Sequence, residues 1–215
     1  MQMQFAKTGI ICHGARATRQ AESLIRYLSK YLSTTDFVKG NIEKEERDKM
    51  WESVSLISLI NYPNDLEKID TGLDVLFQIV YGDDEIGLKE AINIKEKTSI
   101  PTIALVINGL KDTDLDIPYI ELEENEIKSI FLDLFSVYTF PQEYGADFEE
   151  LTPLFSHNGK IQASTEFSSL EDTSFCLVFK GEFGPIDCPK NTQAVLTSRK
   201  YQINEAKRCY FIVNN

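Results

Sequence analysis

A histidine and a glycine stand at the end of the first apolar run of the chain. Residues 8–12 predict a strand, and residues 15–32, with apolar side chains at helical spacing, predict a helix. His13 and Gly14 are therefore expected at the carboxyl end of a strand, where open α/β sheets bind ligands, and Arg16 adds a positive charge nearby. His13 could accept a phosphoryl group, or the three residues could bind an anion at the helix N-terminus. The alternative is a structural histidine in a turn.

A second turn carries carboxylates where a phosphate-binding loop would be expected. It follows the apolar strand predicted at residues 73–80 and precedes the helix predicted at residues 86–97. Its single Gly82 cannot supply the close backbone amides of a glycine-rich loop, and Asp83 and Asp84, followed by a glutamate, repel phosphate. A magnesium or calcium site is an alternative, but the ligand alternation of such loops is missing. We favour a helix N-cap with an acidic first turn.

Asp147 and Glu150 lie three residues apart at the start of a short helix predicted over residues 147–155. This spacing puts both carboxylates on one side of the helix, where they could orient a water molecule or a cation. An acidic N-terminal turn explains the pair equally well. The pair therefore does not identify a site by itself.

The overall charge excludes some classes of partner. The 215 residues include 34 acidic and 22 basic side chains, a net charge of −12, which disfavours nucleic acids and anionic membranes. We expect no signal peptide and no membrane span, because no apolar run approaches the length of either. The four cysteines form no CxxC pair and indicate reduced thiols in a cytoplasmic protein, with a bridge between Cys176 and Cys188 as the lesser alternative.

Familiar catalytic motifs are missing from the sequence. There is no GxSxG, HExxH, GxxxxGK[ST] or GxGxxG pattern, and two histidines cannot form a histidine-rich metal site. We therefore expect no metal and no cofactor, and the sequence favours a protein that is not an enzyme.

Strands alternate with helices between residues 7 and 109, which predicts a parallel sheet covered on both faces. Residues 54–62 and 102–107 are predicted to be further strands. Residues 36–50 are predicted to be a surface loop or solvated helix, and residues 123–138 an amphipathic helix. The pattern changes after Pro141. The expected fold is α/β, with a three-layer parallel-sheet domain at residues 1–140 and a smaller α+β domain at residues 141–215.

Two stretches resemble the FtsZ/tubulin superfamily of filament-forming GTPases. Residues 72–82, the following helix and residues 100–107 are laid out like the strand, phosphate loop, helix and strand around that family's glycine-rich signature. Residues 127–135, 144–155 and 158–164 resemble its central helix, its synergy loop and the first elements of its second domain.

This resemblance implies a member that has lost its own nucleotide site. Residues 82–87 contain acids where the family has glycines and threonines. Asp147 and Glu150 match the synergy-loop acids that act on the nucleotide of a neighbouring subunit, although Gly145 stands where the family has Asn. The implied activity is contact with a filament or a partner protein.

A second resemblance covers the beginning of the chain. Residues 9–15 and the following helix are similar to the first strand and turn of mannose-type phosphotransferase IIA domains, and residues 70–77 are similar to a later strand. In that family the histidine of this turn carries a phosphoryl group. The resemblance implies a phosphocarrier that uses His13, with Arg16 and Arg19 holding the phosphate.

The leading hypothesis is a non-catalytic, FtsZ/tubulin-like interaction protein that binds a filament, another protein or a second copy of itself. The phosphocarrier is the first alternative. A sensor for a small ligand, with its pocket at the strand ends beside His13 and Gly82, is the second.

Overall fold

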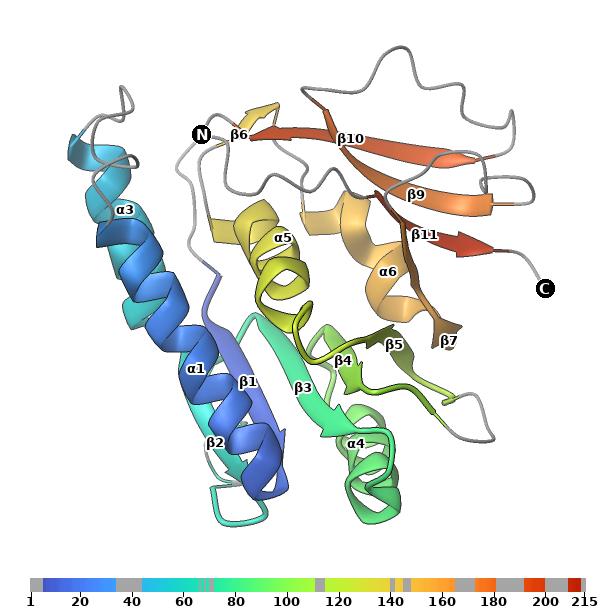
Figure 1. The fold of residues 1–215 in the computed structure, drawn as a ribbon. Coiled ribbons are helices and arrows are strands. Elements are labelled where there is room, and N and C mark those ends of the chain that lie inside the picture. The colour runs from blue at the N-terminus through green and yellow to red at the C-terminus, as the bar shows by residue number, and fades with distance from the viewer. Residues whose placement is uncertain are drawn as a thin grey trace.

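Six parallel strands form the larger sheet, here called sheet A, in the order β2-β1-β3-β4-β5-β7 (Figure 1). The computed structural model describes residues 6–33, 44–65, 67, 69, 72–110, 115–139, 142–144, 148–164, 173–180, 192–199 and 209–213. The strands of sheet A are β1 (Thr8–His13), β2 (Ser58–Tyr62), β3 (Val75–Tyr81), β4 (Thr102–Ile107), β5 (Pro118–Leu122) and β7 (Gly159–Lys160). Every residue of β1, β3 and β4 is buried, which explains their near-continuous apolar runs.

Helices cover both faces of sheet A and make the three layers that the sequence predicts. On one face lie α1 (Gly14–Ser33) and α5 (Ile127–Thr139), with α3 (Lys44–Ser55) packed against α1. The other face is covered by α4 (Glu85–Lys97). The buried side of α1 repeats at helical spacing: Ala17, Ala21, Leu24, Leu28 and Leu32. The α/β fold class is confirmed.

The order of the strands places the turns after β1 and β3 next to each other. The chain runs from β1 outward to β2 and then returns to the other side of β1 to form β3. The direction of winding therefore reverses between β1 and β3. In doubly wound sheets this switch point is where ligands usually bind, at the carboxyl ends of the strands.

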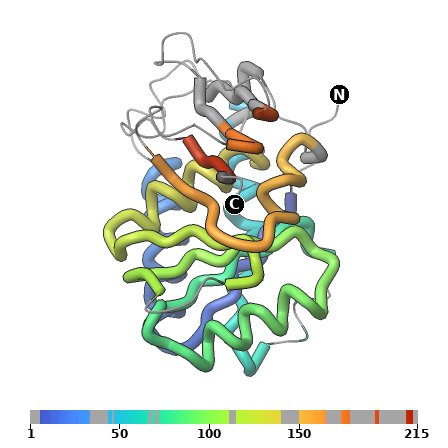
Figure 2. Tube along the Cα trace, turned by 90° about the vertical axis from the view of Figure 1, so that its right-hand side faces the viewer, coloured from blue at the N-terminus to red at the C-terminus, as the bar shows by residue number. Residues whose placement is uncertain are grey.

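The region after residue 140 forms a second, smaller sheet, sheet B, in the order β6-β10-β9-β11-β8. Its strands are β6 (Gln142–Tyr144), β8 (Gln162–Ser164), β9 (Thr173–Lys180), β10 (Gln193–Arg199) and β11 (Cys209–Val213), accompanied by the short helices η2 (Phe148–Leu151) and α6 (Thr152–Ser156). Strands β9 and β10 are parallel, and the other neighbours are antiparallel. Sheet B lies at the opposite end of the molecule from α4 (Figures 1 and 2). The smaller α+β region is confirmed.

The two regions share one hydrophobic core. Strand β7 follows residue 140 but pairs with β5 in sheet A. Leu154 of α6 and Tyr210 of β11 belong to the same buried cluster as Phe77 of β3. The hydroxyl of Tyr210 also donates to the carboxylate of Asp133 in α5 at 2.7 Å, and both residues are fully buried. The smaller region is therefore packed on α5 and sheet A through apolar and polar contacts.

Two predicted elements differ from the structure. Residues 54–62 are expected to form one strand, but α3 continues to Ser55 and β2 begins at Ser58, because Val54 and Met50 are buried one helical turn apart. The helix expected at residues 123–138 begins only at Ile127, and the strand β5 precedes it. Pro118 is the first residue of β5, a position at which proline is tolerated in a sheet. No helix in the described part of the chain is long and apolar enough to span a membrane.

Candidate functional site

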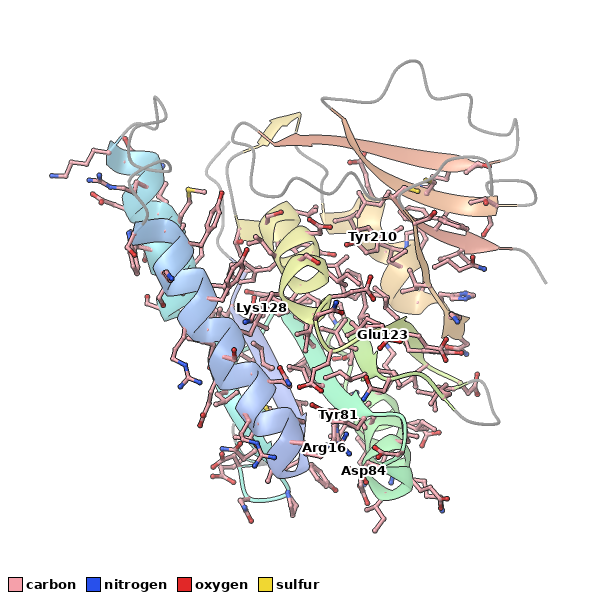
Figure 3. The ribbon with its side chains drawn as sticks, viewed as in Figure 1. Arg16, Tyr81, Asp84, Glu123, Lys128 and Tyr210 are labelled. Carbon is pink, nitrogen blue, oxygen red and sulfur yellow. The ribbon has the colours of Figure 1, made fainter. Side chains whose placement is uncertain are left out.

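The switch point brings the residues predicted after β1 together with those predicted after β3. Gly14 begins α1 with a φ of 82°, a left-handed conformation that glycine adopts without strain. Its Cα faces Asp84, whose Oδ2 would lie 3.8 Å from a Cβ at Gly14. Arg16, in the first turn of α1, binds Asp83. Figure 3 shows Arg16 and Asp84 near Tyr81, the last residue of β3. All six predicted ligand-binding residues therefore lie in this one region: His13, Gly14, Arg16, Gly82, Asp83 and Asp84.

The hydrogen bonds of His13 fix which ring nitrogen carries the proton. His13 is only 3% exposed, and its Nε2 lies 2.9 Å from Oε1 of Gln78 in β3. The other end of the Gln78 amide, Nε2, donates to the carbonyl of Ala91 in α4 at 2.9 Å. Since this bond requires the amide nitrogen to face α4, Oε1 must face His13 and accept its Nε2 proton. Nδ1 then carries the lone pair, and it is buried without a hydrogen-bond partner.

Burial keeps the imidazole neutral. Desolvation lowers the pKa of His13 below 6.5, while the hydrogen bond to Gln78 and the charges of Asp84 and Glu90 act in the opposite direction. The ring of Tyr62 in β2 lies 5.4 Å from the imidazole, centroid to centroid, and its hydroxyl donates to Oε2 of Glu90 at 2.5 Å. This bond raises the pKa of Tyr62 and lowers that of Glu90. His13 is therefore an uncharged, buried imidazole next to Tyr62 of β2 and Gln78 of β3.

Arg16 is held by two contacts on the surface. Its Nη1 donates to both carboxylate oxygens of Asp83 at 3.0 Å, and its guanidinium carbon lies 3.7 Å from the ring centroid of Tyr81. The hydrogen bond to Asp83 raises the pKa of Arg16. About half of each charged side chain is exposed, 49% for Arg16 and 50% for Asp83. Arg16 is thus already paired with an acid of the turn after β3.

Asp84 occupies the N-terminus of α4. Its Oδ1 accepts the backbone N–H of Gly87 at 2.9 Å, which confirms the predicted N-cap. A Cβ on Gly87 would lie 2.6 Å from Oδ2 of Asp84 and 3.0 Å from Cβ of His13, so a side chain at this position would collide with both residues. The carboxylate therefore takes the place in which a helix N-terminus would hold an external anion.

Gly82 allows the turn after β3 to lie close to the turn after β4. A Cβ at this position would lie 1.6 Å from the carbonyl oxygen of Gly109, the second residue after β4. The N–H of Gly82 is already bound to the carbonyl of Ile107 at 2.9 Å. A bound group would therefore find no room at Gly82 and no free N–H there.

The remaining predicted residues lie elsewhere. Glu150 is exposed in η2, in the C-terminal region, and Asp147 is outside the described residues, so their pairing stays a prediction. Cys12, Cys176 and Cys209 are buried, and Cys188 is outside the described residues, so the alternative bridge between Cys176 and Cys188 stays a prediction. Among the described residues no three histidine, cysteine, aspartate or glutamate side chains are grouped so that they could hold a metal ion.

Three residues of the site were not predicted from the sequence: Tyr62, Gln78 and Glu90. Gln78 could have been singled out in the sequence, since it is the one amide in the apolar strand β3. In the structure it is fully buried. A buried amide in such a strand needs hydrogen-bond partners on the neighbouring elements. The order of strands that supplies His13 as this partner is not apparent from the sequence.

A scan against models of protein families gives no match, and no curated protein matches the chain. The function must therefore be argued from the geometry of the site.

Proposed function

We propose that this chain is a non-catalytic protein-binding protein whose anion site at the switch point is closed by its own carboxylates. The observation that carries the proposal is the pairing of both aspartates of the turn. Asp84 caps α4 through the Gly87 amide, and Asp83 neutralises Arg16. The groups that could bind a phosphate at this position thus already bind carboxylates of the chain.

A nucleotide would have to replace these contacts and would gain nothing from the turn. Its phosphates would approach the carboxylates of Asp83, Asp84 and Glu85 at a helix end whose first amides are partly satisfied. Like charges at contact distance are unfavourable, and a divalent cation would need a ligand cluster that the described residues do not form. The turn therefore disfavours binding and hydrolysis of a nucleotide.

The same turn exposes an apolar side chain. Ile86, in the first turn of α4, is 76% exposed, and exposed acids precede it, among them Glu85. An aliphatic anchor with charged neighbours is a common arrangement in protein interfaces, in which the charges select a partner of opposite sign. The proposed partner is a protein with a basic rim around an apolar pocket. An FtsZ/tubulin-like filament and a second copy of this chain are the partners that the sequence suggests, and the FtsZ/tubulin resemblance stays a prediction.

Titration calorimetry with magnesium GTP tests the closed site. We expect no binding to the wild type at a ligand concentration of about 1 mM, the weak limit of specific affinity. The variant Asp83→Asn/Asp84→Ser removes both charges and keeps a side chain that can cap α4, so it is expected to bind inorganic phosphate or nucleotide better than the wild type. Nucleotide binding by the wild type would overturn the proposal.

The partner surface is tested with a matched pair of variants on α4. Ile86→Ser removes the apolar anchor, and Lys89→Ser changes an exposed position on the same helix. Co-sedimentation with a purified FtsZ-type filament and sedimentation velocity of the chain alone measure the two suggested partners. We expect one of these associations to be weakened by Ile86→Ser and not by Lys89→Ser. Absence of both associations, or equal effects of the two variants, would contradict the proposed surface.

A second candidate function is favoured by the protonation state of His13. An uncharged imidazole with Nε2–H held by Gln78 and a lone pair on Nδ1 has the form of a nucleophile for phosphoryl transfer. With phosphoramidate as donor, Nδ1 would form a bond to phosphorus while the donor P–N bond breaks. Ammonia would leave with the protons that the zwitterionic donor already carries, and the Nε2 proton would stay on its bond to Gln78.

Intact-mass spectrometry after incubation with phosphoramidate tests this candidate. It predicts one acid-labile phosphoryl group on Nδ1, absent from the His13→Gln variant. Since His13 is 3% exposed, the first turn of α4 must move for the donor to reach it, and labelling is expected to be slower than for free histidine. No labelling of the wild type, or equal labelling of the His13→Gln variant, would exclude His13 as a phosphoryl acceptor.

A further inference from the structure

The sequence contains two Asn-Gly dipeptides, and the structure gives them different surroundings. Asn108–Gly109 forms the turn after β4, and Asn158 directly precedes Gly159, the first residue of β7. Both asparagines are exposed. An asparagine followed by glycine loses its side-chain ammonia more readily than other asparagines, because glycine has no Cβ to hinder attack of its amide nitrogen on the asparagine side chain. The two dipeptides therefore allow a comparison within one chain.

The turn after β4 leaves both reacting groups of its dipeptide without hydrogen bonds. The φ angles of Asn108 and Gly109 are 65° and 67°, so both residues are left-handed. The backbone N–H of Asn108 donates to the carbonyl of Leu122 at 3.0 Å. Within the described part of the chain, neither the side-chain amide of Asn108 nor the N–H of Gly109 forms a hydrogen bond. A Cβ added at Gly109 would meet no atom within 4 Å, so this side of the turn is open to water.

The glycine amide of the second dipeptide belongs to sheet A. The N–H of Gly159 donates to the carbonyl of Ile117 at 3.2 Å, next to the pairing of Gly159 with Pro118 of β5. The nitrogen cannot attack the side chain of Asn158 while this bond is intact, because attack requires loss of the amide proton. Reaction at Asn158 must therefore wait for local opening of β7 at the edge of sheet A.

The reaction at Asn108 needs water and no other reagent. The nitrogen of Gly109 gives its proton to solvent and forms a bond to Cγ of Asn108. The bond from Cγ to the side-chain nitrogen breaks, and this nitrogen takes up a proton from solvent and leaves as ammonia. Water then opens the resulting succinimide ring at one of its two C–N bonds. Opening at Cγ gives aspartate, and opening at the backbone carbonyl carbon gives isoaspartate, so one water enters, one ammonia leaves and nothing is oxidised or reduced.

We propose that Asn108 is a site of spontaneous deamidation and isoaspartate formation, and that this modification loosens the contact between the turns after β3 and β4. Isoaspartate adds one carbon to the backbone before Gly109. The carbonyl oxygen of Gly109 would lie 1.6 Å from a Cβ at Gly82, so the two turns have no room for a longer backbone. Either product also adds a negative charge to a turn in which the N–H of Leu110 already binds the carboxylate of Glu121 at 3.1 Å.

Peptide mass spectrometry of the purified full chain, incubated at physiological temperature and mildly alkaline pH, tests the modification. We expect Asn108 to convert about tenfold faster than Asn158, equivalent to a barrier difference of about 1.4 kcal/mol, because the Gly159 amide must first be freed. Fragmentation that separates aspartate from isoaspartate should find isoaspartate at Asn108. In urea that unfolds the chain, both sites should convert at similar rates. Equal rates in the folded chain, or the same difference in the unfolded chain, would overturn the proposal.

Hydrogen exchange of the Gly82 N–H, which donates to the carbonyl of Ile107 at 2.9 Å, tests the effect on the turns. Asn108→Gly is the matched variant, because glycine adopts the left-handed φ of this position and has no side-chain amide. Exchange at Gly82 should accelerate in the incubated wild type as isoaspartate accumulates and stay constant in Asn108→Gly. Exchange that is unaffected by isoaspartate, or that accelerates equally in both chains, would refute the coupling. Neither measurement involves the partner proposed for Ile86, so this inference and the proposed function can fail separately.

Discussion

Replacing Gln78 by leucine should destabilise the protein through the buried hydrogen bonds of the switch point. Gln78 is fully buried and joins His13 of β1 to Ala91 of α4 through two bonds of 2.9 Å. Leucine has a similar size but can replace neither bond. A net hydrogen bond contributes about 0.5–1.5 kcal/mol, and the buried Nε2–H of His13 left unpaired costs about 1–3 kcal/mol. Greater apolar burial by leucine offsets part of this loss, so we expect a net destabilisation of about 2 kcal/mol.

A double-mutant cycle in urea measures whether His13 and Gln78 act as one unit. His13→Leu alone leaves Oε1 of Gln78 unpaired, while His13→Leu/Gln78→Leu removes both partners of the bond. The double variant should therefore be about 1–3 kcal/mol more stable than the sum of the single effects predicts. In thermal unfolding, Gln78→Leu alone should lower Tm by about 4–8 °C for a chain of this size. Additive effects within about 0.5 kcal/mol would refute the bond, and with it the assigned protonation of His13.

Three further predictions concern pH, the second region and the turns. The pKa of His13 is lower in the folded than in the unfolded state, so the unfolded chain binds the extra proton as the pH decreases. The free energy of unfolding should therefore fall below about pH 6.5, by about 1.4 kcal/mol per unit of difference in pKa. Urea titrations in this pH range should show the fall in the wild type and not in His13→Leu. Tyr210→Phe removes a hydrogen-bond donor to the buried carboxylate of Asp133 and should lower the free energy of unfolding in urea by about 1–3 kcal/mol. An unchanged urea midpoint would show that this bond does not stabilise the contact with the second region. Gly82→Ala should lower the free energy of unfolding by about 3 kcal/mol or more, because its Cβ would meet the Gly109 carbonyl oxygen. Gly109→Ala has open space but a φ of 67°, so it should lower the free energy of unfolding by only about 1–2 kcal/mol. If thermal unfolding of the two variants gave the reverse order, the close approach of the two turns would be contradicted.

The strands of sheet A were predictable where both faces are buried. Residues 102–107 form β4 with the predicted bounds because an apolar run covered by helices on two sides has no other stable place in the fold. β5 was not predicted, since Pro118 and Glu121 interrupt its apolar pattern and its five residues are short. The boundary between α3 and β2 was misplaced because Val54 fits either a helical or an alternating pattern. Packing against neighbouring elements decides such short segments.

The site was predictable only in part, because some of its contacts join segments that are distant in the sequence. The position of His13 and Asp84 at strand ends follows from local patterns, and so does the N-cap at Asp84. The partners of His13 do not, because they depend on β1 lying between β2 and β3. Only this order brings Gln78 within hydrogen-bond distance and places Tyr62 beside the ring. Contacts between distant segments thus determine which nitrogen of the imidazole is free.

The acidic turn divides into residues that stabilise the fold and residues that do not. Asp84 caps α4 and Asp83 pairs with Arg16, so the structure explains two of the three carboxylates without any external partner. Ile86 makes no comparable contact within the fold, since the residue is 76% exposed. Substitution of Asp84 by alanine should thus affect stability, by about 0.5–2 kcal/mol for the lost cap, whereas substitution of Ile86 should affect only association. The proposed function depends on this separation, since a side chain that the fold does not require is available to bind a partner.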